Sequence, residues 1–175
     1  MLYFIRHGES KANLDEVFAG AQVDSPLTEL GKLQALNSAK ELKELGVVFD
    51  RIISSPLIRA VDTAKIIQEE IGFEGNIEID HRITEYDFGS LTNKKKDKMK
   101  LKNGEIFFAL KAESITSLEL RVHSFLDEFR DTSDNILVSA HGIVIMMARA
   151  ITEGYDISNF YTITPQKNGE IWITD

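Results

Sequence analysis

Short apolar runs alternate with amphipathic helical segments along this chain, and this alternation limits the folds that it can adopt. The runs cover residues 2–5, 51–54, 77–79 and 136–140, and stretches with helical spacing separate most of them. Parallel strands need a crossover of about this length, usually a helix, between them. We therefore predict an α/β fold: a three-layer sandwich with a mostly parallel sheet and helices on both faces.

A first helix is predicted between Thr28, which is a suitable N-cap, and Gly46, which stops it. Its apolar positions keep helical spacing and are expected to face the core; they are Leu30, Leu33, Ala35, Leu36, Ala39 and Leu42.

Three further helices are predicted from their start and stop signals. Pro56 opens one that runs to Gly72. Thr116 with Glu119 resembles a capping box, which predicts a helix over residues 117–129. The last is expected over residues 142–153.

The C-terminal stretch predicts a hairpin or an edge pair. YTIT at residues 161–164 and EIWIT at 170–174 flank a turn that contains Asn168 and Gly169.

Composition limits the function classes. With 175 residues, 43% of them hydrophobic, the chain suits one domain over 1–175. Its net charge of −8 argues against nucleic acid and anionic membranes as partners. There is no cysteine, and no apolar stretch is long enough to span a bilayer. We expect a cytoplasmic protein; the sequence does not indicate an oligomeric state.

Three of the apolar runs pass directly into charged motifs. The first leads into Arg6, His7 and Gly8, the second into SPLIR with Arg59, and the fourth into His141. Gly8 is expected to give the backbone its freedom to turn. Because the carboxyl ends of parallel strands lie along one edge of a sheet, these side chains are expected to converge.

Two arginines and two histidines around one crevice indicate a dense anion, and guanidinium forks suit the oxygens of a phosphoryl group. Ser10, Asn13 and the amides of a helix that begins near Gly142 would add hydrogen-bond donors. The His and carboxylate positions show no closely spaced metal-ligand motif, so no metal and no cofactor are expected.

Four motifs appear in order between Leu2 and about Ala150: "RHGES" with Asn13, "SPLIRAVDTA", "TEYDFG" and "SAHG". Together with "DSPLTELGKLQA" after the first motif, they resemble the histidine phosphatase superfamily, also called phosphoglycerate mutase-like. Each motif alone is a weak signal, and their agreement makes a chance match improbable.

The resemblance implies roles for five residues. His7 would be the nucleophile that becomes phosphohistidine. Arg6, Arg59 and His141 would hold the phosphoryl oxygens, and Glu85 would donate a proton to the leaving oxygen. Such chemistry is sensible, because a neutral imidazole is a competent nucleophile and phosphoryl transfer needs mainly alignment and charge stabilisation.

Other matches are weaker. Ser10 and Asn13 match the phosphate loop of the family, or chiefly cap the turn that follows. Ala19 and Gly20 match a loop that approaches the substrate. An isolated glutamate such as Glu85 is otherwise usually a solvated surface charge.

A lid-like insertion is expected around residues 90–115, because the stretch after the acidic motif overhangs the crevice in the relatives. Here it contains a basic run at 94–102 in an otherwise acidic protein. The run is either a solvated face or a place where Lys94, Lys95, Lys96 or Lys98 meets a second anionic group on the substrate.

Three functions remain open. The first is a metal-independent phosphatase that acts on small phosphomonoesters, the second a phosphoglycerate-type mutase, and the third a phospho-ligand binding module without catalysis. A mutase must shield phosphohistidine from water. The lid region is modest and the printed chain ends at Asp175 directly after a predicted strand, so hydrolysis is favoured. The expected partner is a small phosphorylated metabolite; sugar phosphates, phosphoglycerates, nucleotide-like phosphates, α-ribazole phosphate and phosphoproteins all present the same phosphoryl group.

Overall fold

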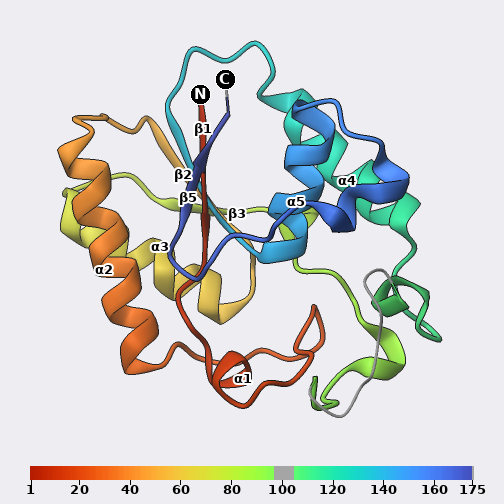
Figure 1. Ribbon diagram of the computed structural model, residues 1–175. Helices are drawn as coiled ribbons and strands as arrows, with labels where there is room; N and C mark the ends of the chain where they lie inside the picture. The colour runs from red at the N-terminus through yellow and green to blue at the C-terminus, as the bar shows by residue number, and fades with distance from the viewer. Residues whose placement is uncertain (97–104, 175) are drawn as a thin grey trace.

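The computed structural model describes residues 1–96 and 105–174 of the chain. Its five-stranded sheet has the strand order β3-β2-β4-β1-β5. Helices α2 and α3 cover one face of the sheet, and α4 and α5 cover the other (Figure 1). The predicted three-layer α/β sandwich is confirmed.

The strands are β1 Leu2–Arg6, β2 Arg51–Ser54, β3 Ile77–Ile79, β4 Ile136–Ala140 and β5 Ile171–Ile173. The α-helices are α1 Lys11–Leu14, α2 Glu29–Glu44, α3 Ile58–Ile71, α4 Ile115–Glu128 and α5 Gly142–Thr152. The described residues also form the 3₁₀ segments η1 His81–Ile83, η2 Gly89–Leu91, η3 Glu105–Phe108 and η4 Ile157–Thr162.

Alternation of side chains along the strands builds two cores. Phe4 and Val138 pack toward α4 and α5, whereas Tyr3, Ile5 and Leu137 pack toward α2 and α3. β4 lies in the middle of the sheet and all five of its residues are buried. β1, β2, β3 and β4 run parallel, so their carboxyl ends meet at one edge, the lower one in Figure 1.

The C-terminal hairpin was predicted wrongly. EIWIT supplies the edge strand β5, which pairs antiparallel with β1, Phe4 lying opposite Trp172. YTIT is not its partner, because Tyr161 and Thr162 end η4 and Ile163 is buried in the core beside α5. An alternating apolar pattern also fits a segment that buries single residues against a helix.

Helix α2 begins after Thr28 as predicted, with the Thr28 hydroxyl accepting a hydrogen bond from Gly31 N at 3.0 Å. The expectation that Leu30 and Leu33 face the core was wrong, since each is 51% exposed. The buried stripe instead runs through Gly31, Ala35, Ser38, Ala39 and Leu42. Leu30 and Leu33 lie off this stripe, from which Ala39 and Leu42 enter the same core as Tyr3 and Ile5 of β1.

The start of α4 was also predicted wrongly. Ser114 is its N-cap and accepts from Ser117 N at 3.0 Å, while Thr116 lies inside the first turn. Helix α3 ends at Gly72 as predicted, with a left-handed φ of 72°, but begins at Ile58 rather than at Pro56.

The segment over residues 90–115, predicted to be a lid-like insertion, is described at both ends, and residues 97–104, which include Lys98 of the basic run, lie outside the described residues. Within the part of the chain that the structure describes, no helix is both long and apolar enough to cross a membrane.

Candidate active site

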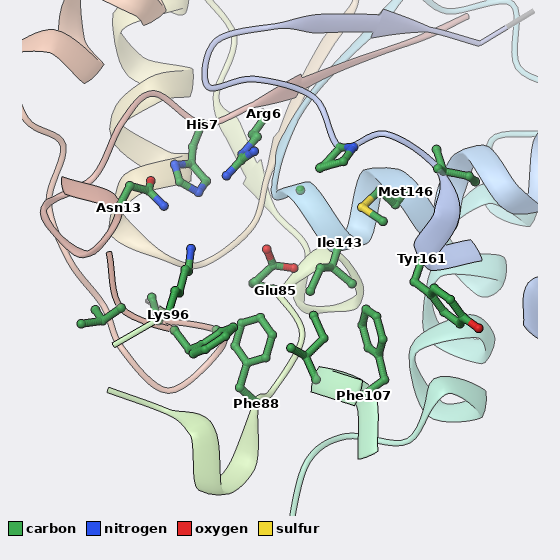
Figure 2. Close-up of a pocket in the computed structure, with 18 of the residues that line it drawn as sticks. Arg6, His7, Asn13, Glu85, Phe88, Lys96, Phe107, Ile143, Met146 and Tyr161 are labelled. Atoms are coloured by element: carbon green, nitrogen blue, oxygen red, sulfur yellow. The ribbon is translucent and has the colours of Figure 1, made fainter. Parts of the chain in front are cut away.

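A cavity of about 680 Å³ opens at the edge where the parallel strands end. The structure brings eight of the predicted site residues to its wall: Arg6, His7, Asn13, Ala19, Gly20, Arg59, Glu85 and Gly142. Figure 2 labels Arg6, His7, Asn13 and Glu85 among them. They come from segments far apart in the sequence, which the parallel topology gathers at one place.

His7 follows β1 directly and is held by hydrogen bonds on both sides of its backbone. Its N–H donates to the Ala140 carbonyl at 3.0 Å, and its carbonyl accepts from Asn168 Nδ2 at 2.8 Å. The ring Nδ1 lies 2.7 Å from the Gly8 carbonyl and therefore carries the proton. Nε2 accepts from Arg59 Nε at 3.2 Å, so this nitrogen carries the lone pair of the ring.

Burial lowers the pKa of His7 well below 6.5, and the positive charges of Arg59 and Arg6 add to this effect; the hydrogen bond to Gly8 opposes it. The imidazole is therefore neutral at neutral pH, which is the state required of a nucleophile.

The loop after His7 is packed against the start of α2 by two glycines. A Cβ on Gly8 would lie 2.1 Å from the Gly31 oxygen, and a Cβ on Gly31 would lie 2.0 Å from the Glu9 oxygen. The φ of Gly8 is outside the left-handed region. Our expectation that Gly8 provides freedom to turn was therefore wrong: glycine is required because two backbones touch.

The Arg59 side chain is buried and fixed by two backbone carbonyls, Val23 O and Gly20 O, each 2.9 Å from a guanidinium nitrogen. Gly20 has a φ of 56°, and a Cβ there would lie 2.6 Å from Tyr86 O. Burial lowers the pKa of Arg59, while Glu85 raises it, and the guanidinium remains charged.

The Arg6 guanidinium lies beside the N-terminus of α5. It donates to the Gln166 carbonyl, and a Cβ on Gly142 would lie 3.5 Å from its Cζ. Burial lowers the pKa of Arg6, whereas Glu85 raises it. Arg6 Nε is buried and has no hydrogen-bond partner among the described residues, so it is a donor available to an anion.

His141 is fully buried behind His7; the two ring centroids are 5.1 Å apart. Its Nε2 lies 2.7 Å from Ser55 Oγ, and its Nδ1 is buried without a partner among the described residues. Burial, followed by the charge of Arg59, lowers the pKa of His141 well below 6.5.

Ser10 and Asn13 have different positions. Ser10 is fully buried and caps α1, its hydroxyl bonding to Asn13 N at 3.3 Å and to Asn13 Oδ1 at 3.0 Å. The structure therefore places Ser10 in the turn. The Asn13 side chain reaches the cavity, with its amide nitrogen toward it in Figure 2.

Glu85 is the acidic side chain at the centre of the cavity in Figure 2. One carboxylate oxygen accepts from Tyr86 N at 2.9 Å, which fixes its orientation.

Of the three described lysines of the basic run, Lys96 reaches the cavity, with its ammonium turned inward in Figure 2. Burial and the charge of Arg6 lower the pKa of Lys96, and Glu85 raises it. Lys95 instead donates to the Asp15 carbonyl, and Lys94 is exposed.

Three polar residues that the sequence analysis did not single out hold the motif residues in place. Ser55 contacts His141, Asn168 contacts the His7 carbonyl, and Thr63 Oγ1 accepts from Gly8 N at 3.0 Å. Ser55 and Thr63 stand four residues before and after Arg59 in one motif, a spacing that could have drawn attention to them.

The sequence analysis also missed the apolar side of the cavity, which we call the apolar wall: Phe88, Ile106, Phe107, Ile143, Met146 and Tyr161. It comes from η3, α5, η4 and the residue before η2. Ile143 and Met146 could have been noticed, because they follow Gly142 at helical spacing.

Among the residues that the structure describes, no group of three or more His, Asp or Glu side chains is arranged to hold a metal ion.

Comparison with curated sequences finds relatives of more than one activity. A 2,3-bisphosphoglycerate-dependent phosphoglycerate mutase from Nitrobacter hamburgensis is 40% identical over 106 residues, 60% of this chain and 51% of the relative. The chain thus spans about half the length of the first curated relatives that it matches. A protein from Hydrogenobacter thermophilus named as a candidate phosphoserine phosphatase is 31% identical, covering 93% of this chain and 83% of its own.

Solved structures share the fold. A mycobacterial glucosyl-3-phosphoglycerate phosphatase, solved with VO₃, has a TM-score of 0.83 at 23% identity and covers 97% of this chain and 90% of its own. An Escherichia coli protein described as a candidate α-ribazole-5′-phosphate phosphatase has a TM-score of 0.79 at 26% identity, covering 97% and 87%.

A family model extends the match to nearly the whole chain. The histidine phosphatase superfamily (branch 1) matches residues 2–175. The order of the four motifs, the sheet topology and this match agree, and the chain belongs to the histidine phosphatase superfamily.

Proposed function

We propose that this protein is a phosphatase that hydrolyses small phosphomonoesters through a phosphohistidine on His7, without a metal or cofactor. The observation that carries the proposal is the state of His7: a buried, neutral imidazole whose Nε2 carries the lone pair and lies beside the Arg59 guanidinium. Relatives named as phosphatases support it. Small phosphorylated metabolites are made and consumed in the cytoplasm, where we expect the protein to act.

In the first step, Arg6 and Arg59 hold the phosphoryl oxygens and align phosphorus with His7 Nε2. A phosphoryl oxygen takes over the Arg59 Nε–H that donates to Nε2, which releases the lone pair. Nε2 bonds to phosphorus as the bond from phosphorus to the ester oxygen breaks. Glu85 gives that oxygen a proton, which contributes about 10²- to 10⁴-fold for an alcohol.

His141 supplies a further donor to the phosphoryl group. If the Ser55 hydroxyl donates to Nε2, the proton of the neutral ring stays on Nδ1, the nitrogen without a partner among the described residues. A preorganised donor of this kind is worth about 10²- to 10³-fold when charge develops on the oxygen that it faces. The N-terminus of α5 at Gly142 adds backbone N–H groups beside Arg6.

In the second step, the Glu85 carboxylate takes a proton from water, and the water oxygen attacks the phosphorus of phosphohistidine. The bond between phosphorus and Nε2 breaks, inorganic phosphate leaves, and His7 returns to its neutral state. One carboxyl group thus serves both steps, because the first leaves it deprotonated as the second requires.

The test is isolation of the phosphoenzyme. Brief mixing with a ³²P-labelled phosphomonoester should label the wild type with an acid-labile, alkali-stable phosphate, and His7→Ala should take up no label and show no turnover. Near-normal turnover by His7→Ala would overturn the mechanism. Tight binding of phosphate esters by the wild type, without label or phosphate release, would identify a binding module instead.

A mutase is the second candidate, favoured by the mutase relatives and by the Lys96 ammonium beside the phosphoryl site. Such a cation suits a carboxylate or second phosphate on the substrate. A mutase assay dependent on 2,3-bisphosphoglycerate, run beside a phosphate-release assay on the same preparation, separates the two activities. We expect phosphate release to dominate.

A further inference from the structure

We propose that the preferred substrates are phosphomonoesters whose organic part is a compact apolar group, best of all an aromatic ring, and not a sugar. The inference rests on the proposed function and names its substrate class. The apolar wall carries it.

The cavity has two unlike halves, as Figure 2 shows. Arg6, His7 and Asn13 lie at one side, and the apolar wall lies at the other, with Glu85 between them. A phosphoryl group at His7 places its ester oxygen toward Glu85, the proposed proton donor. The organic group must then continue beyond Glu85, where Ile143 and Met146 meet it.

The wall is already assembled before a ligand enters. The Phe88 ring lies 5.0 Å from that of Phe18 and 5.4 Å from that of Tyr86. The Phe107 ring lies 5.1 Å from that of Tyr86 and 4.9 Å from that of Phe160. Side chains fixed by such packing lose little freedom on binding, so an apolar ligand gains most of its burial energy.

Among the residues that the structure describes, the same half of the cavity has few partners for hydroxyl groups. Thr162 and Thr164 lie at its exposed rim, and the Thr162 hydroxyl donates to the Asn159 carbonyl at 2.8 Å. A sugar bound against the wall would therefore exchange water for apolar contacts at several hydroxyls. Leaving buried hydroxyls unpaired lowers binding, and the loss grows with each one.

The experiment uses a pair of substrates with the same shape. Glucose 6-phosphate and cyclohexylmethyl phosphate both carry a six-membered ring on a CH₂–O–PO₃ group, and both leave as primary alcohols. We expect kcat/KM to be at least about tenfold higher for cyclohexylmethyl phosphate, with benzyl phosphate as good or better. Equal values, or a preference for glucose 6-phosphate, would overturn the inference.

A polar substitution in the wall should reduce the ratio of kcat/KM for cyclohexylmethyl phosphate to kcat/KM for glucose 6-phosphate. Met146→Gln keeps the length of the side chain and should bring the ratio down several-fold, mainly by raising KM for the apolar ester. Leu120→Gln, on the exposed surface of α4, is the matched control and should leave the ratio unchanged. If Met146→Gln fails to fold, Tyr161→Gln tests the wall at a half-buried position. An unchanged ratio in a folded wall variant would contradict the proposal.

Phosphonates separate this inference from the proposed function, because they bind but are not hydrolysed. Benzylphosphonate should bind at least about tenfold more tightly than methylphosphonate in calorimetry, whether or not the protein turns over any ester. If esters are hydrolysed but the two phosphonates bind equally, the proposed substrate class is wrong and the proposed phosphatase function is supported. If benzylphosphonate binds tightly and no ester is hydrolysed, the preference of the apolar wall is supported and the phosphatase function is wrong.

Discussion

Removal of the Ser55 hydroxyl tests whether this residue positions His141. In Ser55→Ala, His141 Nε2 loses its partner at 2.7 Å, and the ring can place its proton on either nitrogen. A buried hydrogen bond contributes about 0.5–1.5 kcal/mol net, and up to about 3 kcal/mol when a buried group is left unpaired. At about 1.4 kcal/mol for each factor of ten, kcat should fall roughly 2- to 100-fold.

A double-mutant cycle shows whether the loss passes through His141. His141→Ala should lower kcat by about 10²- to 10³-fold, the value of one preorganised donor. Because Ser55 acts through that ring, Ser55→Ala combined with His141→Ala should be no worse than His141→Ala alone.

Two further readouts complete this test. The ¹⁵N shifts of the His141 ring in the resting protein report the tautomer without reference to activity, and Ser55→Ala should move them toward a mixture. Ser55→Thr, which restores a hydroxyl, should recover part of kcat. Multiplicative losses in the cycle, or unchanged ring shifts, would refute the role given to Ser55.

Four other predictions follow from the site. Glu85→Gln should still phosphorylate His7 in a burst with an aryl phosphate and then stall at hydrolysis. With an alkyl phosphate the rate of phosphorylation should fall by about 10²- to 10⁴-fold, so that no burst is seen. Rapid quench measures both, and equal bursts would show that Glu85 is not the leaving-group acid. Activity should survive prolonged chelation because arginines supply the positive charge; loss followed by rescue with a divalent ion would contradict this. Lys96→Gln should raise KM for bisphosphorylated or carboxylated substrates more than for phenyl phosphate, while exposed Lys94→Gln should change neither. The free energy of unfolding should fall as pH drops below about 6.5, because the unfolded chain binds protons at His7 and His141 and the folded protein, where burial lowers both pKa values, does not. Each ring is expected to contribute up to about 1.4 kcal/mol to the free energy of unfolding per pH unit. Replacing both His7 and His141 with Gln should therefore flatten the dependence of that free energy on pH, measured by denaturant titrations at several pH values. An unchanged dependence would refute the prediction.

Topology made much of the fold predictable from the sequence. Arg6, Arg59 and His141 could be brought together in advance because each lies at or shortly after the end of a strand, and parallel strands end at one edge. Patterns within one segment were less informative. The YTIT stretch alternates like a strand, yet Ile163 packs beside α5, and only the tertiary structure decides between the two.

The remaining features depend on contacts between distant segments. Phe107 and Met146 share a cavity wall although they lie in η3 and α5, and no local pattern joins them. The pairing of Ser55 with His141 joins residues 86 positions apart. The buried stripe of α2, which leaves Leu30 exposed, is likewise explained only by what its residues touch.

The contact between Gly8 and Gly31 connects catalysis with the integrity of α2. Besides the touching backbones, Glu9 O accepts from Thr28 N at 2.9 Å and Glu9 N donates to Gln34 Oε1 at 2.7 Å, so the loop after His7 is attached to the first turns of that helix. Opening of this corner would free the loop after His7 from α2, while His7 N–H stays bonded to the Ala140 carbonyl at the end of β4. We therefore expect inactivation by heat or denaturant to begin with this loop, so that activity is lost before the sheet unfolds.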